Sequence, residues 1–285
     1  MKKILFPTDF SEVADNAFVY TLHLAKSMQA EIIVVHAFDA DVLSSFHSGH
    51  PELVANVYTT MELGEFEQFK KEGQKLREIA EKHQLSDLKI SFMFEAGGLP
   101  HILTKVAKKE GISMVVMGTS GASGFGKRFW GTNTLNAMQS MNLPVLSIPG
   151  SAEFHTIKNI GFTTVFKDSD KEILQELLTA SEYFNAQIKV LHIIEYSGNV
   201  EKKEAFAAEK INEWKHFFSS DKLDFVVSKA DDLRKGVLGF TKSENIDALV
   251  IAKRNLSFID SLFYSSLSDK LASKIDIPLL VIKEK

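Results

Sequence analysis

The chain has 285 residues, of which 45% are hydrophobic and 25% charged, a composition typical of a folded globular protein. Its net charge is −4, and neither half carries the basic surplus expected of proteins that bind nucleic acid or anionic lipid. The absence of cysteine excludes disulfides and thiolate catalysis. No apolar run has the length of a membrane helix, so we expect a cytoplasmic protein that has neither nucleic acid nor membrane as a partner.

Short apolar runs alternate with helical patterns along the first half. Runs that are apolar on consecutive residues are typical of parallel strands covered on both faces. They predict strands at 4–6, 32–35, 114–117 and 145–148. Ser11 is predicted to cap the first helix. The apolar stripes of the first two helices are expected to be Ala14, Ala17, Phe18, Thr21, Leu22 and Ala25, and then Phe66, Phe69, Leu76 and Ile79.

Residues 39–59, between the second strand and the second helix, contain Pro51 and two histidines but no sustained periodicity. This pattern predicts a long surface loop. The spacing of His47 and His50 could hold a metal together with a nearby aspartate, but no cysteine or second clustered pair supports such a site. We therefore predict no metal-binding residues.

The second half of the chain repeats the first. Residues 30–36 (AEIIVVH) recur as 186–192 (AQIKVLH), and residues 114–118 (MVVMG) recur as 248–252 (ALVIA). The two offsets, 156 and 134, leave 22 extra residues in the first copy, within the region of the expected loop. The repeat predicts two tandem α/β domains, 1–150 and 151–285. In the second domain we expect strands at 188–194, 225–227, 249–251 and 279–282, and helices around 174–178 and 206–218.

A glycine-rich segment follows the strand at 114–117 and holds five glycines within residues 118–131. Ligands of open parallel sheets bind beyond the carboxyl ends of the strands, and glycine lets backbone N–H groups approach an anion closely. A helix that starts at Thr132 would add free N–H groups and a positive dipole end, and Lys127 adds a cation. The segment suits a polyphosphate, although glycine-rich loops also occur as simple tight connections.

The second copy contains no glycine in its corresponding segment, residues 252–266. Since the connection can be made without glycine, the glycines of the first copy are better explained by the close approach of a ligand. The P-loop pattern fails because Arg128 stands where a Ser or Thr would hold Mg²⁺, and GxGxxG fails as well. The pattern that fits is GxxG, nine residues, then G[ST], formed by Gly118, Gly121, Gly131 and Thr132.

This spacing resembles the nucleotide motif of the ATP-binding branch of the universal stress protein family. Residues 6–11 (FPTDFS) resemble the family's exit from strand 1, and residues 35–37 (VHA) resemble the end of its strand 2. The resemblance covers the whole chain as a tandem pair. It implies two open parallel five-stranded sheets with helices on both faces, Rossmann-like and similar to adenine nucleotide alpha hydrolases. It also implies an intramolecular pseudo-dimer in which strands 145–148 and 279–282 lie antiparallel, and it allows further homo-oligomers.

The resemblance further implies that the first domain binds ATP or another adenine nucleotide, together with Mg²⁺. Asp9 would lie at the adenosine end and the backbone of Ala37 would contact the adenine edge, while the motif residues would hold ribose and phosphates. Asp9 has an alternative role as a cap of the helix that follows it. The complete predicted site consists of Pro7, Thr8, Asp9, Ala37, Met117, Gly118, Gly121, Lys127, Gly131, Thr132, Asn133 and Thr134.

The second domain looks like a degenerate copy that binds no nucleotide. Val165 replaces Asp9, and Ala252, Asn255 and Ser265 replace three of the glycines. We therefore expect a stress-response or regulatory protein with slow or no ATP hydrolysis, at most a weak ATPase or autophosphorylation activity, and no catalytic residues. The alternative is a nucleotide-using enzyme, an ATPase or adenylyl transferase, with a substrate pocket under the 39–59 loop. The residues after strand 1 differ from the SGGxDS-like loop of the PP-loop enzymes of this fold, which disfavours that alternative.

Overall fold

The computed structural model of the chain describes residues 2–38, 51–119, 132–254, 259, 262 and 275–284, with the backbone alone for 51–59 and 132–133. The chain divides into two compact units, Met1–Gly150 (unit 1) and Ser151–Lys285 (unit 2). Among the described residues, no helix combines the length and the apolar character needed to cross a membrane.

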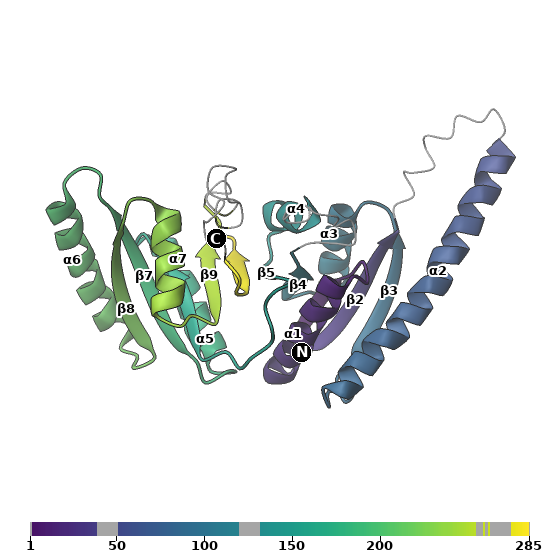
Figure 1. The fold of residues 1–285 in the computed structure, drawn as a ribbon, viewed down its shortest axis with the longest axis horizontal. Helices are drawn as coiled ribbons and strands as arrows, with labels where there is room; N and C mark the ends of the chain where they lie inside the picture. The colour runs from purple at the N-terminus through teal and green to yellow at the C-terminus, as the bar shows by residue number, and fades with distance from the viewer. Residues whose placement is uncertain are drawn as a thin grey trace. The chain divides into compact units, whose positions relative to one another are not determined.

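Unit 1 alternates strands and helices along the chain, and Figure 1 labels most of them. Its strands are β1 (Lys3–Pro7), β2 (Glu31–Phe38), β3 (Ile90–Ala96), β4 (Met114–Gly118) and β5 (Val145–Ile148). Its helices are α1 (Glu12–Met28), α2 (Pro51–Lys82), α3 (Leu99–Glu110) and α4 (Thr132–Ser140). The strands are all parallel and form a sheet in the order β3-β2-β1-β4-β5.

Unit 2 repeats this order. Its strands are β6 (Asn159–Thr163), β7 (Gln187–Glu195), β8 (Leu223–Ala230), β9 (Ala248–Ala252) and β10 (Leu279–Ile282). The helices α5 (Asp168–Ser181), α6 (Val200–Phe218) and α7 (Leu233–Ser243) connect them. The parallel order β8-β7-β6-β9-β10 corresponds strand by strand to that of unit 1. The predicted fold class of two open, parallel, five-stranded α/β sheets is thereby confirmed.

The strand order reverses between β1 and β4 in unit 1, and between β6 and β9 in unit 2. Because parallel crossovers are right-handed, the reversal places α1 and α2 on one face of the first sheet and α3 on the other. Ligands of such sheets bind in the crevice outside the carboxyl ends of the strands at the reversal. The crevices of the two units are therefore the places where a site is expected.

The core of unit 1 follows the sequence pattern. The inner strands β1 and β4 are almost entirely buried, as consecutive apolar residues predict for a sheet covered on both faces. The predicted stripe of α1 is buried throughout, and the side chain of Ser11 caps this helix by accepting from the N–H of Ala14. The stripe of α2 is only partly confirmed, because Phe69 and Leu76 are buried whereas Phe66 remains 39% exposed.

The prediction of a loop over residues 39–59 is wrong from Pro51 onward, where α2 begins. Proline favours the first turn of a helix because the N–H that it lacks would have no intrahelical partner there. We interpreted Pro51 as a loop residue and so missed this helix start. Since α2 has 32 residues and α6 has 19, much of the insertion lengthens a helix. Residues 39–50, with His47 and His50, lie outside the described part of the chain.

The internal repeat extends to unusual backbone angles. Phe10 and Phe166, which correspond at the offset of 156, have φ angles of 58° and 61° in the left-handed region. Gln29 and Asn185, another corresponding pair, both have φ of 50°. Bulky residues rarely adopt such angles. Their recurrence at matched positions shows that the exits from β1 and β6 have the same backbone form.

Candidate functional site

The carboxyl ends of β1 and β2 are tied together at the crevice of unit 1. The N–H of Thr8, directly after β1, donates to the carbonyl of Val35 (3.0 Å), and the carbonyl of Thr8 lies 2.8 Å from Nδ1 of His36. The ring of Phe10 packs on His36 with centroids 5.0 Å apart. The predicted site residues Pro7 and Thr8 are buried in this junction.

Asp9 follows this junction and is exposed at the crevice. Its Oδ1 accepts from both the backbone N–H (3.1 Å) and the hydroxyl (2.7 Å) of Ser11. Ser11 is the N-cap of α1. Asp9 therefore orients the capping residue and does not cap the helix itself, so the alternative role of Asp9 as the helix cap is wrong.

The end of β4 is joined to the start of α4. The hydroxyl of Thr134 donates to the carbonyl of Gly118 (2.8 Å), and the N–H of Thr119 donates to Ile148 at the end of β5 (3.1 Å). Thr134 and Thr119 are both buried, as is Met117 within β4. The free N–H groups of the first turn of α4 thus begin beside the carboxyl end of β4, the arrangement that favours anions.

The structure gives Gly118 a packing role that the sequence did not predict. A Cβ atom at this residue would lie 2.9 Å from Cγ1 and 3.1 Å from the carbonyl oxygen of Val13 in α1. Glycine is therefore required at this position for helix–sheet packing. Packing against Val13 thus explains Gly118 without the approach of a ligand.

The remaining predicted residues divide into two groups. Ala37 is half-buried near the end of β2, where it is opposite Glu95 of β3. The backbone of Thr132 and Asn133 forms the start of α4. Gly121, Lys127 and Gly131 lie outside the described residues, in the segment between β4 and α4. Within the described ranges, no three His, Asp or Glu side chains gather as a metal site.

The corresponding crevice of unit 2 holds a buried acid. Asp170 in the first turn of α5 is 0% exposed. Its Oδ2 accepts from the hydroxyl of Thr164 (2.8 Å), the N–H of Val165 (3.1 Å) and the N–H of Lys167 (3.2 Å). These donors lie directly after β6, so one carboxylate fixes the whole exit from that strand.

A cation and a second acid complete this network. Oδ1 of Asp170 forms an ion pair with Arg254, two residues beyond β9, and Arg254 also pairs with Glu284. The guanidinium therefore joins the ends of β6 and β9, which flank the strand-order reversal of unit 2. We call Asp170, Arg254 and Glu284 the unit 2 ion network. It supplies internal charge at the location where a ligand of unit 2 would bind.

The residues of unit 1 that correspond to the ion network are small and uncharged: Ala14, Ser120 and Gly150. Val165, which the sequence identified as the counterpart of Asp9, is 49% exposed, whereas the ion network was not predicted. The available signal was an aspartate at a buried position of the helix stripe, where the first copy has alanine. The 84 residues that separate Asp170 from Arg254 concealed the pairing.

A histidine repeats at both crevices. Nδ1 of His192 lies 3.1 Å from the carbonyl of Thr164, as His36 does with Thr8, and Phe166 packs on its ring with centroids 4.8 Å apart. Burial lowers the pKa of His192, and its contact with the carbonyl of Thr164 opposes this in part. The neutral ring of His192 is therefore favoured, and its contacts are those of a residue that packs at the strand end.

The doubly wound parallel sheet, with its strand-order reversal, gives each unit a Rossmann-like fold. Residues 1–149 and 156–283 each match the universal stress protein family, and the chain belongs to this family. The resemblance that we inferred from the sequence is thereby confirmed.

Two relatives of known sequence each match about half of the chain. Universal stress protein MJ0577 of Methanocaldococcus jannaschii is 30% identical over 162 residues, which cover 52% of this chain and 94% of that protein. Universal stress protein YxiE of Bacillus subtilis is 29% identical over 149 residues, or 51% of this chain and 97% of that protein. Each relative is therefore about half as long as this chain.

A solved structure spans both copies. The crystal structure of a universal stress protein from Archaeoglobus fulgidus matches with a TM-score of 0.68 at 16% identity, covering 99% of this chain and 98% of that one. At this identity the likeness concerns the fold alone. It agrees with the α/β architecture of both units.

Proposed function

We propose that unit 1 binds ATP, with Mg²⁺, in the crevice at the ends of β1, β2 and β4, and that unit 2 binds no nucleotide. The observation that carries this proposal is the contrast between the crevices. That of unit 2 holds the Asp170, Arg254 and Glu284 ion network, whereas that of unit 1 has uncharged counterparts and the start of α4. A crevice that lacks the buried ion network of unit 2, beside the helix N–H groups at the start of α4, suits a polyphosphate.

The residues of unit 1 fit the parts of such a ligand. The exposed carboxylate of Asp9 can accept hydrogen bonds from ribose hydroxyls, and the backbone of Ala37 can contact the adenine edge. Gly121 and Gly131 would allow phosphates to approach the backbone, next to Lys127 and the first turn of α4. Bound Mg²⁺ would neutralise part of the phosphate charge.

We further propose a regulatory role with slow or no hydrolysis. At the described strand ends of unit 1, Asp9 is the exposed carboxylate, and its Oδ1 is committed to Ser11. Proton abstraction from an attacking water requires a base placed within hydrogen-bond reach of it. The contacts of Asp9 therefore favour nucleotide binding over rapid hydrolysis. Bound nucleotide would then regulate by ordering the surface around the crevice of unit 1.

Substitutions at Asp9 and Ser11 separate the two roles of this carboxylate. Asp9→Asn keeps an Oδ1 acceptor for Ser11 but removes the negative charge, and should weaken ATP binding about tenfold, as the loss of charged hydrogen bonds predicts. Ser11→Ala removes the cap and should reduce the free energy of unfolding by about 1 kcal/mol without changing affinity. Calorimetric titration with Mg²⁺ and ATP measures the affinities, and denaturant unfolding measures the stabilities.

The opposite pattern would contradict the proposal. If Asp9→Asn bound ATP as tightly as the wild type, Asp9 would have only its structural role at the start of α1. If release of inorganic phosphate were fast in the wild-type protein, the regulatory reading would be replaced by the enzymatic one.

A further inference from the structure

The outer strand of unit 1, β3, offers an open backbone edge. Among the described residues it pairs with β2 alone and ends the sheet. The N–H of Ile32 donates to Lys89 (2.9 Å) and the N–H of Gly97 donates to Phe38 (2.8 Å), which fixes the phase of the ladder. Odd-numbered residues of β3 therefore bond to β2. The residues whose backbone groups point outward are Ile90, Phe92, Phe94 and Ala96.

The edge of β3 lacks the side chains that normally prevent another strand from pairing with a sheet edge. Charged side chains, above all lysine, and proline guard natural edges. Residues 90–94 (ISFMF) contain neither, and Glu95 is paired with Lys105 of α3 (2.7 Å). The corresponding outer strand of unit 2, β8, carries exposed Asp224 and Lys229, of which Lys229 pairs with Glu204 of α6. Of the two outer strands, β3 thus carries fewer charged side chains.

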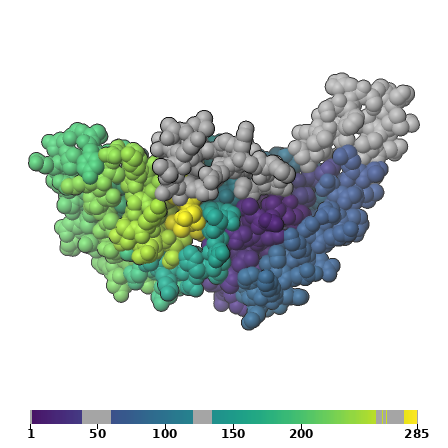
Figure 2. Space-filling view, in the orientation of Figure 1, coloured from purple at the N-terminus to yellow at the C-terminus, as the bar shows by residue number. Residues whose placement is uncertain are grey.

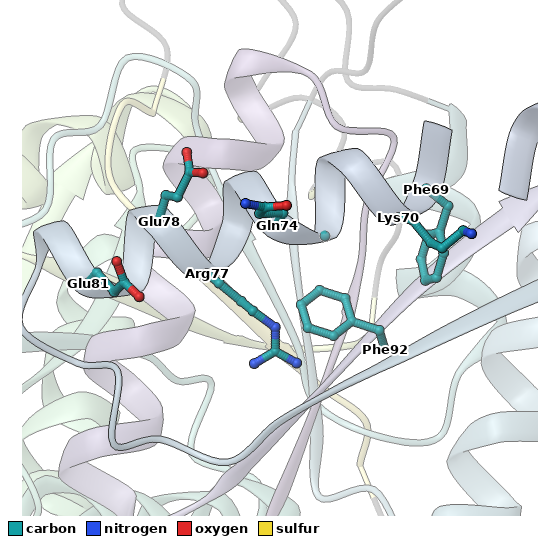
Figure 3. Close-up of a pocket in the computed structure, with 8 residues that line it drawn as sticks. Phe69, Lys70, Gln74, Arg77, Glu78, Glu81 and Phe92 are labelled. Carbon is teal, nitrogen blue, oxygen red and sulfur yellow. The ribbon is translucent and has the colours of Figure 1, made fainter. Parts of the chain in front are cut away.

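A groove of 590 Å³ lies between α2 and β3, lined by residues of these two elements. Its floor is the ring of Phe92, which lies in ordinary contact (3.4 Å) with the place of a Cβ atom on Gly73. Arg77 reaches from α2 over this ring, 4.8 Å from its centroid, and Glu78 and Glu81 also line the groove (Figure 3). No described residue forms an ion pair with Arg77. The surface of α2 is exposed along the flank of unit 1, in blue in Figure 2.

Unit 2 has the same groove in a reduced form. Phe69 packs edge-on against Phe92 (6.3 Å), and Trp214 does so against Phe225 (6.5 Å), so Phe69 and Trp214 correspond. Four residues further along each helix stand Gly73 and Phe218. The phenylalanine occupies the place that glycine leaves empty, and the groove of unit 2 measures only 330 Å³.

We propose that β3 pairs antiparallel with β3 of a second copy of this chain, about a two-fold axis at Met93. Met93 is the middle residue of the strand, so all seven residues of β3 pair, and the outward-pointing residues form the hydrogen-bonded pairs. Phe92 then lies opposite Phe94 of the second copy, and Ser91 opposite its Glu95. No like charges meet in this register.

The groove supports this register. Directly opposite residues of an antiparallel pair share one face of the sheet, and Phe92 and Phe94 both contact Phe69 on the α2 side. The ring of Phe94 from the second copy would therefore enter the groove beside Phe92. Arg77 would lie over an aromatic pair, an arrangement that adds a cation–π contact. The side chain that fills the groove is thus Phe94 of the second copy, placed there by the same two-fold axis that pairs the strands.

Single cysteines test the register without background, because the chain contains no other cysteine. In a non-hydrogen-bonded antiparallel pair the Cα atoms are about 4.5 Å apart, within the range of a disulfide. Met93→Cys should therefore form a disulfide-linked dimer under mild oxidation. Val226→Cys, at the corresponding residue of β8, is the matched control and should remain largely monomeric.

Filling the groove tests the role of the aromatic ring. Gly73→Phe copies Phe218 of unit 2, and should weaken dimerisation about tenfold in sedimentation velocity, as the loss of a buried aromatic contact predicts. Its circular dichroism spectrum should match the wild type. A wild-type protein that sediments as a monomer at every attainable concentration would overturn the proposal. Cross-linking of Val226→Cys but not of Met93→Cys would overturn it as well.

Discussion

Replacing Asp170 with alanine is expected to lower the free energy of unfolding of unit 2 by about 3 kcal/mol, the lower end of the range for breaking a buried ion pair. The substitution leaves the hydroxyl of Thr164 and the N–H groups of Val165 and Lys167 without their acceptor. It also removes the buried carboxylate that forms an ion pair with the guanidinium of Arg254. Unpartnered buried donors cost more than the net value of the bonds that they made.

Fluorescence can isolate this effect in unit 2. The chain has two tryptophans, Trp130 and Trp214, so in a Trp130→Phe background the signal comes from Trp214, which is fully buried on α6. Asp168→Ala removes an exposed acid from the same first turn of α5 and should cost only about 0.5 kcal/mol, the value of a helix-dipole interaction. If the Asp170 and Asp168 variants unfolded at the same denaturant concentration, the ion network would not stabilise unit 2.

Replacing Gly131 with valine is expected to weaken ATP binding about 100-fold, because a branched side chain would keep phosphate oxygens from several backbone N–H groups at once. Gly131 lies outside the described residues and directly precedes α4. The variant should fold normally, since the second copy has Ser265 at the corresponding position. Calorimetric titration measures the affinity, and circular dichroism checks the fold.

Ser265→Val is the matched control for this variant. It places the same side chain at the corresponding position of unit 2, which we propose binds no nucleotide. ATP affinity should then equal that of the wild type. An unchanged affinity in a folded Gly131→Val protein would move the site elsewhere, and a loss of affinity in Ser265→Val would assign it to unit 2.

The sequence predicted the sheets well because their determinants are local. Consecutive apolar residues such as those of β4 identify a strand buried on both faces, whereas the outer strand β3 was not among the strands predicted in the first copy. Helix boundaries were harder to predict from the sequence. Pro51 is compatible with a loop or with the first turn of a helix, and its neighbours carry no periodicity strong enough to decide between them. The antiparallel pairing of β5 with β10 in a pseudo-dimer stays a prediction.

Candidate site residues were predicted unevenly for a physical reason. Asp9 and Thr134 follow from their place after a strand or at a helix start, and the structure puts both beside the crevice of unit 1. The close contact of Gly118 with Val13 depends on how a helix packs on the sheet, which spacing does not encode. The ion network of unit 2 joins three distant parts of the chain, so the sequence could indicate Asp170 as unusual but not its pairing with Arg254.

The central claim is that one of two similar crevices binds an adenine nucleotide and the other does not. The number of nucleotides bound by the intact chain tests it most directly, by calorimetric titration with ATP in the presence of Mg²⁺. We expect a single site per chain, with the same stoichiometry in the Asp170→Ala variant if that protein remains folded. A stoichiometry of two, or no binding at all, would contradict the account.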